Sequence, residues 1–382
     1  MKEIAYRLLT AVLLGTGAAG LWLDTSSLAP YAPVLLGLGG LFLANAAVCA
    51  TYYRSGTPWP AASSDPQPFR IGWLDYVKAA LSWLDAFKRS YVVEPGLYYT
   101  GERYDRDTPL LVTSNYRLTV FLVVRRVRAF NARLLVVDTD GINVWCAAGK
   151  GMFGNRAILD QLGRYERRTL TDGKWLKLVL PKFGLAGVDL RALRGEQIRP
   201  IIGPLYAREL PGYLAQQPLR DRDEDRVVFG LRMRAFSWLP GLKQMFGYSL
   251  LLVLGFMAAH WLWGSSVPVG LIAVTTVVAT AYPLLYPWIP GERFAIKGLW
   301  LGAAIAASLA LGARAGLLAP AALLASVPFA LAVGLFFGLA YTGNSAVSNY
   351  TKVRKETAQF LVPDVALFVA SLLAFIAMES KV

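Results

Sequence analysis

Two hydrophobic stretches enclose a charged central segment in this chain, and that pattern constrains its fold more than any other feature. Hydrophobic residues make up 55% of the sequence and charged residues only 17%, and most of the charges lie between Arg54 and Lys243. An ordinary soluble domain carries more charge and has no such long uncharged stretches. The pattern is typical of a membrane protein with one soluble domain, and it excludes a disulfide scaffold, a collagen-like chain and a disordered tail.

Seven stretches are long and apolar enough to cross a membrane as helices, which takes roughly 20 mostly apolar residues. They are Ile4–Leu23, Ala32–Tyr53, Phe246–Gly264, Val267–Trp288, Ile296–Ala313, Leu318–Tyr341 and Phe360–Met378. We therefore predict two transmembrane helices within residues 1–53, a linker at 54–69, an α/β domain at 70–243 and a five-helix transmembrane domain at 244–382. We interpret the first stretch as a retained helix, because no clear cleavage pattern for a signal peptide follows it.

Basic residues beside the hydrophobic stretches predict the orientation of the chain. Lys2 and Arg7 precede the first stretch, the following connection at 24–29 has no Lys or Arg, and Arg54 begins the central segment. Later connections on the same side carry Arg293, Lys297, Lys352, Arg354 and Lys355. Because cytoplasmic loops are enriched in Lys and Arg, we predict a multi-pass protein of the cytoplasmic membrane whose soluble domain faces the cytoplasm.

The central segment is strongly basic, with 30 Lys and Arg residues against 19 Asp and Glu residues. A domain of that charge suits an anionic lipid surface or an acidic protein partner. We expect no nucleic-acid partner, since no recognition motif accompanies the charge. Two cysteines, Cys49 and Cys146, are too few for a four-thiolate zinc or iron–sulfur site, and His260 is the only histidine.

Short apolar runs alternate with helical patterns in the central segment. The runs predict strands at Leu110–Thr113, Leu134–Asp138, Leu176–Leu180 and Ile198–Ile202. The periodic stretches between and beside them predict helices at Ile71–Arg89, Leu118–Phe130, Leu185–Leu193 and Ala207–Gln216. This alternation favours a mainly parallel, Rossmann-like sheet covered on both faces. Ligands of such sheets bind beyond the carboxyl ends of the strands. Three segments follow those ends: Thr113–Tyr116, Asp138–Lys150 and Gly203–Tyr206.

The segment after the second predicted strand contains the one cysteine of this domain. Asn143 is a suitable N-cap for a short helix that ends near Gly149. Cys146 would then lie in the first or second turn, where the helix dipole and free amides favour a thiolate, and Lys150 would add positive charge. Composition alone would favour an inert, packed cysteine.

The octet Asn-Val-Trp-Cys-Ala-Ala-Gly-Lys at 143–150, followed by Gly151 and then Phe153-Gly154, resembles the cap-helix motif of the corrinoid protein of microbial mercury methylation. That family is similar in turn to the large subunit of the corrinoid iron–sulfur protein. Weaker matches follow the same order along residues 70–378, at Pro95–Tyr98, Val112–Tyr116, Leu180–Pro181, Ile202–Pro204, Tyr341–Ser345 and Lys355–Glu356. Met152 departs from the family pattern, where Thr is expected, and the two N-terminal stretches are an addition to it.

The resemblance implies that the domain at 70–243 binds cobalamin or a related corrinoid, with Cys146 as the lower axial ligand of cobalt and the catalytic residue. The absence of histidine from this domain is compatible with a thiolate ligand, which is soft and electron-donating. The resemblance also assigns cofactor contacts to the octet, while Thr113 and Asn115 are candidates because they leave a neighbouring strand. The predicted cofactor-binding residues are Thr113, Asn115, Asn143, Val144, Trp145, Cys146, Ala147, Ala148, Gly149 and Lys150.

The resemblance further implies a methyltransferase that receives a methyl group from methyltetrahydrofolate or a separate methyltransferase and passes it to Hg(II), giving methylmercury. Returning cobalt to its reduced state requires an external donor, and the resemblance implies a ferredoxin with two 4Fe–4S clusters. Membrane lipid is the remaining expected partner.

Two other interpretations stay open from the sequence. The corrinoid could serve another acceptor, namely a different metal, a metalloid or an acetyl-CoA-type enzyme. Alternatively, the chain could be a non-enzymatic membrane transporter or sensor with a ligand-sensing α/β domain, although few charges lie inside the hydrophobic stretches.

Overall fold

The computed structural model describes residues 65–85, 91–173, 175–216, 218–222, 226–238, 240–241, 267–345 and 347–379. The described residues form two compact units, one made of 65–233 with 345–352 and the other of 234–344 with 353–379. The predicted helices Ile4–Leu23, Ala32–Tyr53 and Phe246–Gly264 lie outside the described residues, as do Cys49 and His260.

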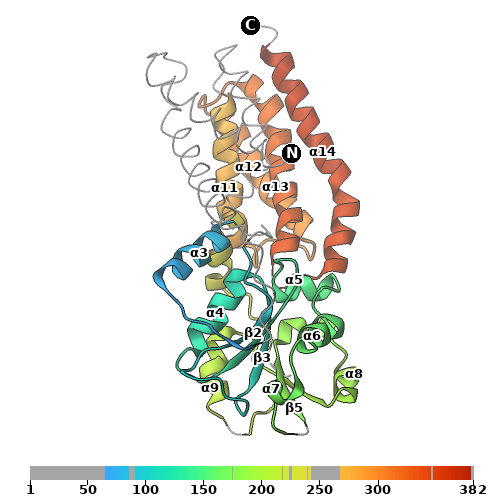
Figure 1. Cartoon of the computed structure of the whole chain (residues 1–382). Helices are drawn as coiled ribbons and strands as arrows, with labels where there is room; N and C mark the ends of the chain where they lie inside the picture. Colours follow the sequence, from blue (N-terminus) through green and yellow to red (C-terminus); the bar gives the residue numbers. More distant parts are fainter. Residues whose placement is uncertain are drawn as a thin grey trace. The chain divides into compact units, whose positions relative to one another are not determined.

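A six-stranded sheet organises the first unit (Figure 1). Its strands are β1 (Gln67–Pro68), β2 (Gly96–Tyr99), β3 (Leu110–Ser114), β4 (Arg133–Val137), β5 (Leu176–Leu180) and β6 (Ile198–Ile202), in the order β1-β2-β4-β3-β5-β6. The pairing of β2 with β4 is antiparallel and the other four pairings are parallel. The sheet is therefore mixed: the four strands predicted from sequence pair in parallel with one another, and β1 and β2 form a second parallel pair.

Alternating side chains of the strands form a core on each face of the sheet. Along β4, Leu135 and Val137 pack with residues of the helices that follow it, including Val144 and Ile158. Leu134 and Val136 point to the opposite face and pack with helix residues such as Val124. Both faces are thus covered, as the alternation of strands and helices predicted. Figure 1 shows α4 and α9 on one side of the strands and α6 and α8 on the other.

The helices of this unit are α3 (Trp73–Leu84), α4 (Arg117–Val127), α5 (Val144–Gly149), α6 (Asn155–Leu162), α7 (Arg167–Leu170), η2 (Lys182–Gly187), α8 (Leu190–Gly195), η3 (Ala207–Glu209) and α9 (Leu210–Leu214). The predicted helix Leu185–Leu193 is wrong as one element. Asp189 accepts hydrogen bonds from the backbone N–H groups of Arg191 and Ala192 and so begins a new helix there. The sequence analysis also missed β1, β2 and α6.

The second unit consists of long apolar helices: α11 (Val267–Leu285), α12 (Phe294–Arg314), η4 (Pro320–Ala322), α13 (Leu323–Asn344) and α14 (Tyr350–Glu379). Among the described residues, three helical stretches are long and apolar enough to cross a membrane, at Phe294–Arg314, Pro320–Gly343 and Thr351–Met378. The prediction of seven such helices is therefore not supported. The apolar part of α11 spans only Gly270–Leu285 and is shorter than these three.

Glycines bring α12 and α13 into backbone contact. A Cβ atom added to Gly298 would lie 2.0 Å from the carbonyl oxygen of Gly334, and one added to Gly338 would lie 2.4 Å from that of Phe294. Both helices carry glycine at a four-residue spacing, which is a known device for close helix packing in membranes. Buried Glu356 caps α12 by accepting hydrogen bonds from the backbone N–H groups of Phe294 (3.2 Å) and Ala295 (2.8 Å).

Candidate functional site

The side chain of Asn115 joins the carboxyl ends of β3 and β4. Its Oδ1 atom accepts hydrogen bonds from the backbone N–H groups of Thr139 (3.1 Å) and Gly141 (3.0 Å) and from the Thr139 hydroxyl (2.8 Å). Its Nδ2 atom donates to Oδ1 of Asp138 at 3.0 Å. Asn115 is only 4% exposed, so these bonds are shielded from water. The residue therefore holds the loop that leads into α5.

The loop itself turns sharply through two residues with positive φ, Asp140 (54°) and Gly141 (67°). Glycine adopts such angles without steric strain, and aspartate is one of the few other residues that tolerate them. The turn reverses the chain directly before the octet, so that α5 begins at the carboxyl edge of the sheet.

Asn143 caps α5, as predicted. Its Oδ1 atom accepts a 2.9 Å hydrogen bond from the backbone N–H of Cys146. At the other end, Gly151 has a φ of 74°, and the N–H of Met152 donates to the carbonyl of Ala147 at 2.9 Å. This left-handed ending satisfies carbonyls of the last helical turn. Both ends of a helix of only six residues are thus held by local hydrogen bonds.

The two faces of α5 differ in what they contact. Val144, Ala147 and Ala148 are buried in the core of the unit. Cys146 and Trp145 are partly exposed, and Gly149 and Lys150 are exposed. The open face of the helix therefore carries Trp145, Cys146, Gly149 and Lys150, four of the ten residues predicted to contact a cofactor.

Ala147 and Ala148 are small because the protein itself approaches them. A Cβ atom added to Gly187 of η2 would lie 3.2 Å from Cα of Ala148 and 2.1 Å from the carbonyl oxygen of Phe153. Gly184 is equally confined, with Phe153 and Val144 within 3.1 Å of its added Cβ. The resemblance predicts that Ala147 and Ala148 contact a cofactor, whereas in the structure Ala148 packs against η2.

Burial dominates the electrostatics of Cys146. It raises the pKa of the thiol above the ordinary value, while the nearby charge of Lys150 and the hydrogen bond from Asn143 act in the opposite direction without reversing it. The sequence favoured a thiolate at Cys146, and the structure corrects this for the free protein. The helix terminus and Lys150 lower the pKa of the thiol, but the loss of solvation outweighs them and raises it.

Thr113 belongs to β3 and is buried, and its hydroxyl oxygen has no hydrogen-bond partner among the described residues. The side chain of its neighbour Ser114 is in the same situation. The structure thus places Asn115 and the octet at one edge of the sheet. The side chain of Asn115 is hydrogen-bonded to the loop after β4, and Thr113 is buried within the sheet.

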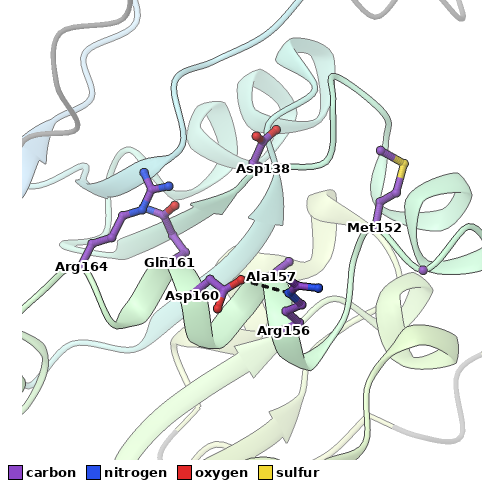
Figure 2. Close-up of a pocket in the computed structure, with 8 residues that line it drawn as sticks. Asp138, Met152, Arg156, Ala157, Asp160, Gln161 and Arg164 are labelled. Atoms are coloured by element: carbon purple, nitrogen blue, oxygen red, sulfur yellow. Dashed lines mark ion pairs between the residues drawn. The ribbon is translucent and has the colours of Figure 1, made fainter.

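A pocket of about 310 Å³ lies next to this edge, and the sequence analysis missed it (Figure 2). Asp138 at the end of β4 and the turn after α5 form one part of its wall. One face of α6 and the turn after it form the other, with residues at helical spacing: Ala157, Asp160, Gln161 and Arg164. The i, i+3, i+4, i+7 spacing could have revealed this face, had 155–162 been predicted as a helix.

The fold and the site define an α/β protein that presents a single thiol on a short capped helix at the carboxyl edge of its sheet, joined to hydrophobic helices long enough to span a membrane. No protein-family model matches the chain. Over 126 residues, 32% of its length, it is 31% identical to the acetyl-CoA decarbonylase/synthase complex subunit gamma 1 of Methanosarcina thermophila, and 30% identical to subunit gamma 2 of the same organism. The match spans about a quarter (26%) of each of these subunits.

Proposed function

We propose that this chain is a membrane-anchored corrinoid methyltransferase that holds cobalt through Cys146 and transfers a methyl group to Hg(II). The observation that carries the proposal is the placement of Cys146. It is the only thiol within 70–243, and it lies on the open face of a helix fixed at both ends, at the edge of the sheet where α/β proteins bind ligands. The resemblance of the octet to the mercury-methylation family supports the identity of cofactor and acceptor.

The residues around Cys146 fit such a group. Trp145, Gly149 and Lys150 share its open face and would hold the group there, while the alanines of the helix stay buried. Asn143 and Asn115 position α5 and the loop before it and do not contact the cofactor, because their side-chain oxygens already accept hydrogen bonds from backbone N–H groups. Of the predicted cofactor contacts, the open-face residues are therefore the ones we assign to direct binding.

A bound corrinoid would supply a cobalt ion able to carry a methyl group. The protein would supply the Cys146 sulfur as a ligand, and since burial raises the pKa of this thiol, the sulfur would have to lose a proton when it binds cobalt. A thiolate is a soft, strongly electron-donating ligand, so a cobalt ion held by Cys146 would release a methyl group more readily to a soft acceptor such as Hg(II). Lys150 stabilises the thiolate once it forms. Asn143 keeps the sulfur at a constant position on the helix.

Three further parts of the proposal concern partners and location. The methyl group comes from methyltetrahydrofolate or a separate methyltransferase. The reductant is a ferredoxin with two 4Fe–4S clusters, and the basic central segment suits an acidic protein of that kind. The apolar helices anchor the chain in the cytoplasmic membrane with the α/β unit on the cytoplasmic side, in accord with the distribution of Lys and Arg.

A second candidate function is a corrinoid methyl carrier for an acetyl-CoA-type enzyme. The similarity to gamma subunits of acetyl-CoA decarbonylase/synthase complexes favours it. Both candidates use the same cofactor and the same Cys146, and they differ only in the acceptor of the methyl group.

The test uses the full chain in detergent, reconstituted without oxygen with methylcobalamin. The visible spectrum reports corrinoid binding, and methyl transfer is measured with Hg(II), with other thiophilic metals and with an acetyl-CoA-forming enzyme in parallel. Methylmercury formed well above the buffer rate supports the first candidate, whereas transfer to the enzyme alone supports the second. A chain that stays colourless after reconstitution contradicts both.

Two variants test the role of Cys146. Cys146→Ala is expected to lose transfer and to change the spectrum of the bound corrinoid, since no thiolate remains below the ring. Cys146→His keeps a coordinating atom, but imidazole donates less electron density than a thiolate. This variant should therefore bind corrinoid and transfer the methyl group more slowly. Cys49→Ser is the matched control and should behave as the unmodified chain. Equal turnover in all four proteins would refute the ligand assignment.

A further inference from the structure

The pocket beside α6 contains a hydrogen-bond donor that the protein does not use. Gln161 is only 3% exposed, and its Nε2 atom has no hydrogen-bond partner of normal geometry among the described residues. The Tyr165 hydroxyl lies near enough for Gln161 to lower its pKa. An amide nitrogen carries two N–H donors, so at least one remains unused even if the other turns towards Tyr165. Buried donors are rarely left in this state.

The charges around the pocket are mixed and nearly balanced. Arg156 forms an exposed ion pair with Asp160 at 3.6 Å, drawn as a dashed line in Figure 2. Arg164 has no ion-pair partner within the part of the chain that the structure describes. Asp138 faces the pocket with a carboxylate whose Oδ1 already accepts from Asn115 and from the N–H of Asp140. Donors of α6 and an acceptor at the end of β4 therefore line one small space.

A neutral group that both accepts and donates hydrogen bonds matches this lining. Its oxygen would accept from Gln161 and Arg164, and its N–H would donate to Asp138. A phosphate or carboxylate matches less well, because Asp138 and Asp160 would repel it. Ala157 leaves room above the helix. The volume of about 310 Å³ is at the lower limit of ligand pockets, enough for a side arm but not for a whole macrocycle.

We infer that this pocket binds a primary carboxamide, and that in the complex it holds one of the amide side arms at the rim of the corrin ring. The inference rests on the proposed function for the identity of the ligand. Geometry supports the connection, since Gly151 and Met152 of the pocket wall directly follow the helix that carries Cys146. One continuous segment, 143–152, thus contributes the metal ligand and part of the side-arm pocket.

The experiment measures dissociation constants of the full chain for three corrinoids. Cobalamin is the reference, cobinamide keeps the amide side arms but lacks the nucleotide, and cobyrinic acid has carboxylic acids in place of the amides. The unmodified chain should bind cobinamide at least about tenfold more tightly than cobyrinic acid. Gln161→Leu, which is similar in size, should weaken binding of cobalamin and cobinamide alike, by roughly 3- to 10-fold for one lost hydrogen bond.

Arg164→Met provides a second variant at an exposed position that does not endanger folding, and it should shift affinity in the same direction. Arg191→Met on α8 is the control with the same change of charge and should leave all three constants unchanged. Equal affinities of Gln161→Leu and the unmodified chain overturn the inference, as does tighter binding of cobyrinic acid. If Gln161→Leu bound cobalamin more weakly but cobinamide as tightly as the unmodified chain does, the inference would also be overturned, since the pocket would then hold the nucleotide. Absence of binding by the unmodified chain would refute the proposed function itself.

Discussion

The amide nitrogen of Asn115, at the end of β3, donates a 3.0 Å hydrogen bond to the carboxylate of Asp138, at the end of β4. The two residues are 23 positions apart in sequence, yet this contact joins the loop that supports Cys146 to the pocket beside α6. Asn115 binds the loop through its oxygen and Asp138 through its nitrogen.

Asn115→Ala should destabilise the α/β unit by roughly 2–4 kcal/mol, because the backbone N–H groups of Thr139 and Gly141 would lose their buried acceptor. The Thr139 hydroxyl would keep the carbonyl of Ile142 as its acceptor. Asn115→Asp keeps an acceptor but places a second carboxylate against Asp138, so it should also destabilise, and less so at low pH. Hydrogen exchange of residues 138–149 is the measurement. If both variants exchanged like the unmodified chain, Asn115 would not hold the loop.

Lys150→Met should raise the pKa of the Cys146 thiol further, since it removes a positive charge that lowers it. The measurement is the rate of alkylation by iodoacetamide against pH, in a Cys49→Ser background. The midpoint should move to higher pH in Lys150→Met and stay in place in Lys177→Met, an exposed control on β5. A midpoint that moved to lower pH would contradict the assignment.

The same raised pKa makes stability depend on pH. The thiol binds its proton more tightly in the folded state than in the unfolded state, so its contribution to stability is complete below the unfolded pKa of about 8.5 and is lost as pH rises through the folded value. Unfolding of the chain without cofactor should become easier above that pH. Cys146→Ala should lack this component, and an identical slope in both proteins would disprove it.

Gly187→Ala should push Phe153 and α5 away from η2, because the new Cβ would lie 2.1 Å from the carbonyl oxygen of Phe153 and 3.2 Å from Cα of Ala148. The expected cost is about 1–3 kcal/mol or more, together with faster exchange of residues 144–149. Gly195→Ala at the end of α8 is the matched control, since its Cβ would meet nothing within 4 Å. Equal thermal stability of the two variants would show that the close approach is unimportant.

Gly298→Ala should separate α12 from α13, where the added Cβ would lie 2.0 Å from the oxygen of Gly334. We expect thermal unfolding in detergent at a clearly lower temperature, corresponding to roughly 1–3 kcal/mol. Gly270→Ala in α11 has open space around its Cβ and should be neutral. A neutral Gly298→Ala would mean that the two helices can repack.

Features that depend on neighbours in the chain could be predicted from the sequence. The cap of α5 joins Asn143 to Cys146, three residues away, and its ending depends on Gly151, so a few residue types were sufficient. The four parallel strands followed from apolar runs, and the apolar helices from hydropathy. These signals are local. The hydrogen bonds of caps and turns join residues a few positions apart, and the composition of a segment is sufficient to predict whether it is buried.

Features that depend on distant residues required the tertiary structure. Only the fold shows that β2 pairs antiparallel with β4, that Gly187 approaches Ala148, and that Gln161 and Asp138 line one pocket. The protonation of Cys146 belongs to this group as well. The sequence contains the charges that favour a thiolate, but the opposing loss of solvation arises only when Cys146 packs against the core of the folded unit.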